Sequence, residues 1–264
     1  MFDSVAKEYD DQFTNTQLGR MYRKQVHIYL GQSFSKNKAL NILELNCGTG
    51  EDAIYLANQG HKIIACDVSS EMINVAKQKV SKKSLNDKVT FVECDIRNLH
   101  SSIRQKKYNF IFSNFGGLNC LSPQDLAKLS QEIVNLLEDN GRFIAVVMPK
   151  FCLWESIYFA AKFQFEKIFR RNSNKAVKVK VGTDYIETWY YSPSDFKHIF
   201  GHEFEILKSL PIGIALPPPY LNAFFEKKKS ILRILLKLEN VLKNLAGLSS
   251  ISDHYLIDFI KRKS

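Results

Sequence analysis

The stretch Ile42–Ala53 has the sequence Ile-Leu-Glu-Leu-Asn-Cys-Gly-Thr-Gly-Glu-Asp-Ala, in which a short apolar run leads directly into a glycine turn. The apolar run predicts a buried strand, and the residues after the turn predict a helix. Gly48 and Gly50 allow a sharp turn and let a ligand approach the backbone without a Cβ in the way. Asn46 is one of the few other residue types that tolerate positive φ, so the turn can begin there. The stretch therefore predicts a nucleotide-type pocket at the end of a strand.

The next apolar run, Lys62–Val68, predicts a second buried strand that ends in Asp67, 19 residues after Gly48. An acid at this distance from a glycine turn binds the hydroxyls of a ribose. The helix after the turn opens with Glu51 and Asp52, whose charges would repel a pyrophosphate at the helix N-terminus. S-adenosylmethionine (SAM) has a ribose, an adenine, positive charge and no phosphate. The sequence therefore favours SAM over a nicotinamide dinucleotide.

These features resemble the class I SAM-dependent methyltransferases. The first motif of that family, an acid followed by a glycine-rich turn, is present as Glu44-Leu-Asn-Cys-Gly-Thr-Gly50, with Asn46 in place of the usual first glycine. The resemblance covers about residues 1–148, with the later motifs in the same order. It implies a set of cofactor-binding residues, namely Tyr9, Glu44, Asn46, Gly48, Gly50, Asp67, Val68, Met72, Asp95, Ile96, Asn114 and Phe115. Tyr9 has a structural alternative, in which it only packs its helix onto the sheet.

Apolar runs alternate with helical patterns from residue 40 to residue 148, which predicts parallel strands joined by helical crossovers. We expect an α/β fold with a doubly wound, mostly parallel seven-stranded sheet, an N-terminal helical segment and an inserted α/β lid. The resemblance implies that the last strand is antiparallel. The expected strands begin at Ile42, Lys62, Val89, Tyr108, Gly141, Phe204 and His254. Ligands of such sheets bind beyond the carboxyl ends of the strands, where Glu44, Asp67, Asp95 and Asn114 fall.

Four segments are expected along the chain. They are an N-terminal helical cap (1–35), a SAM-binding Rossmann-like core (36–150), a helix and β-hairpin lid (151–200), and the last two core strands with a helical insertion at 217–247 (201–264). The lid pattern predicts a helix over 151–169 and a hairpin that turns at 182–184. The insertion pattern predicts one long helix over about 221–245, with apolar residues opposite lysines.

The second half of the chain holds the candidates for catalysis. Methyl transfer to a weak nucleophile needs a base, and the catalytic residue stays undetermined among His254, His202 and Tyr191, each of which has a structural alternative. Further candidates are His198, Tyr190 and Asn119. The many aromatic residues of the lid predict either an apolar acceptor pocket or the core of the lid itself. The basic helix 221–245 is interpreted as a cap on its own domain, with membrane contact as the less favoured alternative.

The net charge of +10 comes from lysines scattered along the chain, which favours a solvated surface over a nucleic-acid partner. Five cysteines, an odd number without a CxxC motif, argue against a disulfide framework and against a metal site. With no apolar signal core and no membrane-spanning run, the sequence predicts a cytoplasmic protein. It leaves the oligomeric state open.

We therefore expect a SAM-dependent methyltransferase that acts on a small organic molecule, apolar or lipid-like. One alternative is an NAD(P)-dependent oxidoreductase, because the turn also satisfies the dinucleotide pattern Gly48-x-Gly50-x-x-Ala53. The other is a non-catalytic SAM-binding or membrane-associated scaffold that uses the basic helix. The acceptor atom stays open among oxygen, nitrogen, carbon and sulfur.

Overall fold

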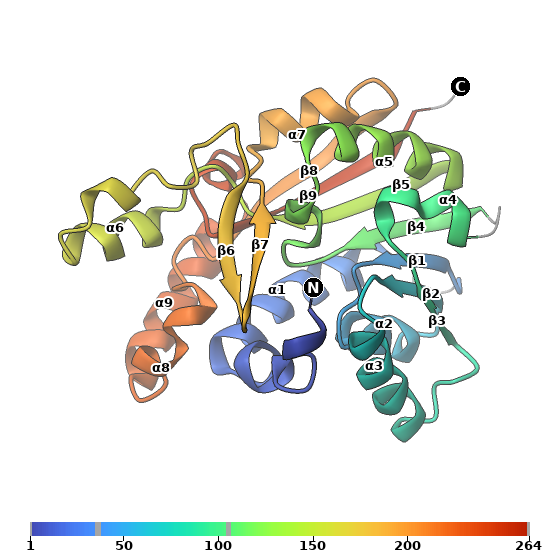
Figure 1. Ribbon diagram of the computed structural model, residues 1–264, viewed down its shortest axis with the longest axis horizontal. Coiled ribbons are helices and arrows are strands. Elements are labelled where there is room, and N and C mark those ends of the chain that lie inside the picture. The colour runs from blue at the N-terminus through green and yellow to red at the C-terminus, as the bar shows by residue number, and fades with distance from the viewer. Residues whose placement is uncertain (1, 35–37, 104–106, 263–264) are drawn as a thin grey trace.

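The computed structural model describes residues 2–34, 38–103 and 107–262. The predicted boundary between cap and core, at residues 35 and 36, falls outside these ranges. A seven-stranded sheet in the order β3-β2-β1-β4-β5-β9-β8 forms the centre of the molecule (Figure 1). Its strands are β1 (Asn41–Leu45), β2 (Lys62–Asp67), β3 (Val89–Glu93), β4 (Tyr108–Ser113), β5 (Leu137–Val147), β8 (Phe204–Ile212) and β9 (His254–Lys261).

The sheet confirms the predicted fold class. Strands β1 to β5 pair in parallel, whereas β9 pairs antiparallel with both β5 and β8. Four of the five residues of β1 are buried, because helices cover both faces of the sheet. This double coverage explains why the strands are continuous apolar runs and do not alternate with polar residues.

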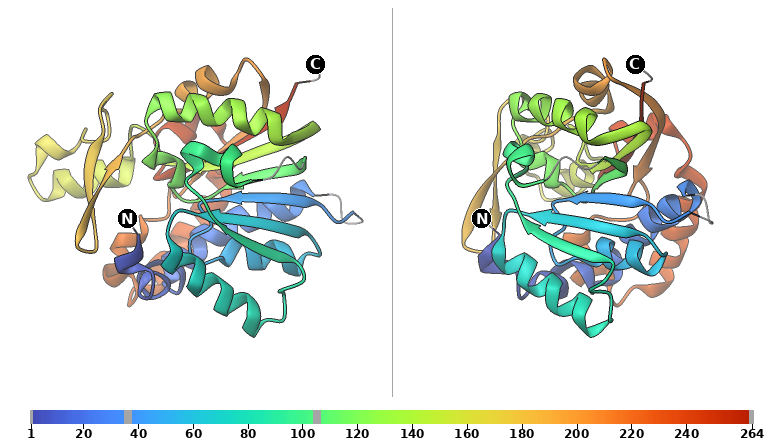
Figure 2. Two further views of the ribbon diagram at one scale, coloured as in Figure 1. Left: turned by 45° about the vertical axis from the view of Figure 1, so that its right-hand side comes forward. Right: turned by 90° about the vertical axis from the view of Figure 1, so that its right-hand side faces the viewer.

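Helices α1, α2 and α3 pack on one face of the sheet, and α4, α5 and α7 pack on the other (Figures 1 and 2). No helix within the described ranges is long and apolar enough to cross a bilayer. The helices are α1 (Gln17–Ser33), α2 (Glu51–Asn58), α3 (Ser70–Lys82), α4 (Leu99–Ser102), α5 (Pro123–Leu136), α6 (Leu153–Ala161), α7 (Pro193–Phe200), α8 (Asn222–Phe225) and α9 (Lys229–Leu242). Shorter helical turns are η1 (Asp3–Val5), η2 (Asp10–Thr14), η3 (Ile96–Asn98), η4 (Gly117–Cys120), η5 (Phe165–Lys167), η6 (Pro219–Leu221) and η7 (Ala246–Ser250).

The lid segment contains the predicted hairpin, but its helix is shorter than expected. Strands β6 (Val177–Val181) and β7 (Asp184–Thr188) form a separate two-stranded antiparallel sheet with a turn at Gly182. Helix α6 ends at Ala161, and Phe163 then takes a φ of 56°, which a right-handed helix does not allow. The single helix predicted over 151–169 is therefore wrong in its second half.

The helical insertion is broken where one helix was predicted. Its pieces are η6, α8 and α9, and the break follows Phe225, which is buried against Leu18 and Leu232. The carboxylate of Glu239, fully buried on α9, accepts three backbone N–H groups at 2.7–3.0 Å, from Gly213, Ala215 and Leu216. Helix α9 is thus fastened to the loop after β8, and the interpretation of this helix as a docked cap is confirmed.

Candidate functional site

The glycine turn after β1 has the backbone that its sequence predicts. Asn46 has a φ of 54°, and Gly48 and Gly50 have φ values of 52° and 78°. Asp67, at the end of β2, accepts the N–H of Gly48 at 2.8 Å and the N–H of Ser69 at 2.9 Å. Burial raises the pKa of Asp67, against the effect of these two donors. Asp67 therefore fixes the turn as well as facing the space above it.

A cavity of about 190 Å³ lies above this turn, at the carboxyl edge of the parallel strands. Ten of the twelve residues that the sequence analysis assigned to the cofactor line it: Tyr9, Asn46, Gly48, Asp67, Val68, Met72, Asp95, Ile96, Asn114 and Phe115. Phe2, Gly116 and Gly117 also line it, and the lining residues that the sequence analysis missed are Cys94, Arg97, Cys120 and Leu121. The volume is below the roughly 300 Å³ of a typical ligand pocket, and Phe2 and Tyr9 of the N-terminal segment form part of the wall.

Glu44 and Gly50 are the two assigned residues that do not line the cavity. Glu44 is only 1% exposed, and burial raises the pKa of this carboxyl well above its usual range. Gly50 begins α2, and a Cβ on it would lie 2.9 Å from the Cβ of Ala76 on α3. Gly50 therefore allows close packing of α2 against α3, and its contact with the cofactor stays a prediction.

The carboxylates at the start of α2 are paired with cations, which the sequence analysis did not foresee. Glu51 forms an ion pair with Lys79. Asp52 is 3% exposed, forms an ion pair with Arg23 and lies 2.6 Å from His27 Nε2. Burial raises the pKa of Asp52, but Arg23 and His27 outweigh burial and hold that pKa well below its usual range. These ion pairs weaken the charge repulsion by which the sequence analysis disfavoured a pyrophosphate ligand. The choice between SAM and a dinucleotide therefore depends on the residues that line the cavity.

The N-terminal segment is attached over the cavity by polar contacts. Asp10 accepts the hydroxyl of Thr49 at 2.6 Å and the ammonium of Lys79 at 2.7 Å. Tyr9 both lines the cavity and packs against Phe13, with ring centroids 5.9 Å apart. Tyr9 therefore packs its own segment and also forms part of the cavity wall, and its contact with the cofactor stays a prediction.

The wall of the cavity has the polar groups that an adenosyl ligand with a positive charge needs. Among the described residues, the buried Oδ1 of Asn46 has no hydrogen-bond partner, so it is left to accept from a ligand. Asp67 offers a carboxylate, and Val68 and Ile96 offer apolar surface for an adenine ring. Asp95 is paired with Arg97, which holds the pKa of Asp95 below its usual value. The residues present fit SAM.

A buried ionic chain lies next to Phe115, which lines the cavity, but the residues of this ionic chain do not line the cavity themselves. The ring of His254 contacts that of Phe115, with centroids 5.7 Å apart, and its Nδ1 lies 3.0 Å from Asp253 Oδ2. Arg171, 5% exposed, donates to Asp253 Oδ1 at 2.8 Å and to Glu155 Oε2 at 3.0 Å. Burial raises the pKa of Asp253, but His254 and Arg171 outweigh burial and keep that pKa well below its usual range. Asp253 stays ionised and holds His254 in place.

The other catalytic candidates do not line the cavity, and the polar groups of several of them are engaged in contacts with other residues. Tyr191 is 3% exposed and donates its hydroxyl to the carbonyl of Leu121 at 2.6 Å, so its role is structural. Asn119 is fully buried and bonds to both the N–H and the carbonyl of Met148. Tyr190 is 4% exposed, and the guanidinium of Arg171 lies over its ring.

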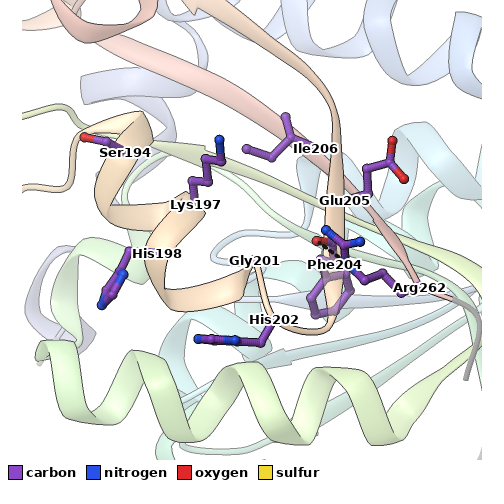
Figure 3. Close-up of a pocket in the computed structure, with 9 residues that line it drawn as sticks. All are labelled: Ser194, Lys197, His198, Gly201, His202, Phe204, Glu205, Ile206 and Arg262. Atoms are coloured by element: carbon purple, nitrogen blue, oxygen red, sulfur yellow. Dashed lines mark hydrogen bonds between the residues drawn. The ribbon is translucent and has the colours of Figure 1, made fainter.

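His198 and His202 face a different cavity, formed by α7, β8 and the residue after β9 (Figure 3). This cavity is larger, about 620 Å³, but most of its lining side chains are exposed, including both histidines. His202 is therefore wrong as a catalytic candidate for chemistry at the first cavity. Within the described ranges no three His, Cys, Asp or Glu side chains gather to hold a metal ion.

The sequence analysis named His254 but missed Asp253, Arg171 and Glu155 as its partners. Asp253 directly precedes His254, so the adjacent acid and histidine were a signal that could have been used. Arg171 and Glu155 come from distant parts of the lid, and nothing in their spacing indicates that they meet.

Comparison with known proteins agrees with this geometry. Residues 42–141 match the family model described as a methyltransferase domain. The chain is 29% identical to demethylmenaquinone methyltransferase of Bacteroides fragilis over 148 residues, which cover 54% of this chain and 57% of that protein. It is 28% identical to tRNA 5-carboxymethoxyuridine methyltransferase of Escherichia coli over 104 residues, which cover 39% of this chain and 40% of that protein. The chain therefore spans about half the length of the curated relatives it matches.

The fold is shared with solved methyltransferase structures. The CcbJ methyltransferase of Streptomyces caelestis superposes with a TM-score of 0.60 at 14% identity, which covers 90% of this chain and 88% of that one. The likeness in fold thus extends beyond the matched residues 42–141.

Proposed function

Residues 42–141 of this chain belong to the methyltransferase-domain family, and we propose that the chain is a SAM-dependent methyltransferase acting on a small, largely apolar organic molecule. The observation that carries the proposal is the cavity above the glycine turn. Its wall contains Asp67, an acid placed to bind ribose hydroxyls, and the side-chain amide oxygen of Asn46, which has no hydrogen-bond partner among the described residues. Phe115 also lines the cavity. The match to the methyltransferase-domain model gives no support to the alternative of a nicotinamide dinucleotide.

The chain's own residues divide the work of holding SAM. Asp67 accepts hydrogen bonds from the ribose hydroxyls, Val68 and Ile96 hold the adenine, and Asn46 accepts from the ammonium group. When bound, SAM supplies a methyl group on a positively charged sulfur. The protein has to align the acceptor with that methyl group and keep water out, and the rings of Phe2 and Tyr9 in the cavity wall suit the second task.

We assign the role of base to His254. Asp253 accepts a hydrogen bond from Nδ1 of His254, so Nε2 is the basic nitrogen that can take a proton from an acceptor hydroxyl or acidic C–H. Arg171 acts through Asp253, because it keeps that carboxylate charged and in place. The aromatic ring of Phe115, which lines the cavity and contacts His254, provides apolar surface for the acceptor.

A reducing, cytoplasmic location belongs to the same proposal. All five cysteines are free thiols, and four of them are buried among the core strands and the lid. A protein secreted into an oxidising compartment would gain nothing from this arrangement.

The test is transfer of labelled methyl from SAM to a panel of acceptors. The panel contains hydroquinones, phenols and carboxylic acids, together with total tRNA because one relative is a tRNA methyltransferase by name. We expect label in an organic acceptor. The His254→Gln variant should lower kcat by about 100-fold, while the exposed control His198→Gln keeps full activity. Label that enters tRNA alone, or equal activity of the two variants, would refute the assignment.

A further inference from the structure

An exposed apolar row runs along α9. It consists of Ile231, Ile234, Leu238, Val241 and Leu245, which are 46%, 66%, 47%, 72% and 53% exposed. Their spacing alternates between three and four residues, which places them along one face of the helix and the turn after it. Single exposed apolar residues are common on proteins, but a continuous row of five is not.

This row is not needed to attach α9 to the domain. The opposite face of the helix does that, because Leu232 is fully buried beside Leu18 and Phe225, and Glu239 binds the loop after β8. The helix therefore has two apolar faces, one docked and one exposed to solvent. Packing within this chain accounts for the apolar residues of the docked face, but it does not account for those of the exposed face.

Helices α6, α8 and α9 lie at the same end of the molecule (Figure 1), and further exposed aromatic residues occur on α8 and just after α6. Phe224 on α8 is 60% exposed, and the ammonium of Lys228 lies 3.3 Å from its ring centroid. Contacts between Trp154 and Phe225 and between Tyr158 and Tyr220 join α8 and η6 to α6. Just after α6, the lid exposes three more phenylalanines, Phe163, Phe165 and Phe169, at 62–83%.

The charges around the row select its partner. Between residues 227 and 245 there are six cations, Lys227, Lys228, Lys229, Arg233, Lys237 and Lys243, and the single acid there is the buried Glu239. A second copy of this chain would bring these cations against each other. An anionic lipid surface would instead pair with them and take up the apolar row.

We propose that α9, with Phe224 and the exposed phenylalanines of the lid, docks on a membrane surface that contains anionic phospholipid. The apolar row enters the boundary between headgroups and acyl chains, and the flanking lysines contact phosphates. This surface is separate from the cofactor cavity, so its test does not depend on methyl transfer.

The experiment is co-sedimentation of the full chain with vesicles of phosphatidylcholine, with and without phosphatidylglycerol. We expect binding to the anionic vesicles that weakens as salt is raised. The double variant Ile234→Ser/Val241→Ser should bind at least about tenfold more weakly, because it removes two side chains that leave water on docking. Leu207→Ser is the matched control, since Leu207 on β8 is 47% exposed and lies outside the row.

Three results would overturn the proposal. They are no binding to anionic vesicles at low salt, equal binding by the double variant and the control, and a wild-type dimer in sedimentation velocity that the double variant abolishes. The last result would mean that a second copy covers the row. Both variants alter exposed positions, and a melting temperature equal to that of the wild type shows that each one is folded.

Discussion

Replacing Asp67 with alanine tests the double role of this residue, because it removes the acceptor of two backbone N–H groups as well as a group that faces the cavity. The N–H groups of Gly48 and Ser69 now donate to Asp67 at 2.8 and 2.9 Å. Each would lose its partner in a mostly buried position, at a cost of about 1–2 kcal/mol. We therefore expect Asp67→Ala to lower the free energy of unfolding by about 2–4 kcal/mol.

The same substitution should weaken cofactor binding. Ribose hydroxyls that lose a charged acceptor lose about 1–3 kcal/mol, which is roughly a 5- to 150-fold rise in the dissociation constant. Calorimetry with S-adenosylhomocysteine measures the affinity, and urea denaturation measures the stability. Asp87→Ala is the matched control, because Asp87 is exposed and does not line the cavity. A folded Asp67→Ala protein with wild-type affinity would refute the placement of the cofactor beside Asp67.

Three further predictions concern stability. Glu239→Ala leaves three buried N–H groups without an acceptor, so thermal melting should show a loss of about 3–6 kcal/mol, and an unchanged melting temperature would contradict the anchoring of α9. Gly50→Ala should cost about 1–3 kcal/mol in urea denaturation, because its φ is 78° and the new Cβ would lie 2.9 Å from Ala76; wild-type stability would show that the α2–α3 contact is loose. Asp52 has a pKa below its unfolded value, so its contribution is present above about pH 4 and is lost as the pH falls further. The difference in stability between the wild type and Asp52→Asn should therefore shrink on acidification, and a constant difference would contradict the ion pair with Arg23.

The sequence predicted those parts of the site that depend on local order along the chain. Asn46, Gly48 and Asp67 are a turn and a strand end whose geometry follows from residue type and spacing, and the structure shows them at the cavity. All seven strands were predicted because apolar runs covered on both faces are distinct in sequence.

The parts that were missed depend on distant residues. Glu51 and Asp52 were taken as uncompensated charges, but their partners Lys79 and Arg23 come from α3 and α1. The break between α8 and α9 likewise follows from tertiary packing of Phe225, which overrides a helical pattern that is continuous in the sequence. No spacing rule connects such residues before the fold is known.

The most direct test of the central claim is calorimetry of the purified chain with S-adenosylhomocysteine and, separately, with NADH. The account predicts micromolar or tighter binding of S-adenosylhomocysteine that weakens in Asp67→Ala, and no heat of binding with NADH. Binding of NADH by a folded sample that takes up neither SAM nor S-adenosylhomocysteine would contradict it.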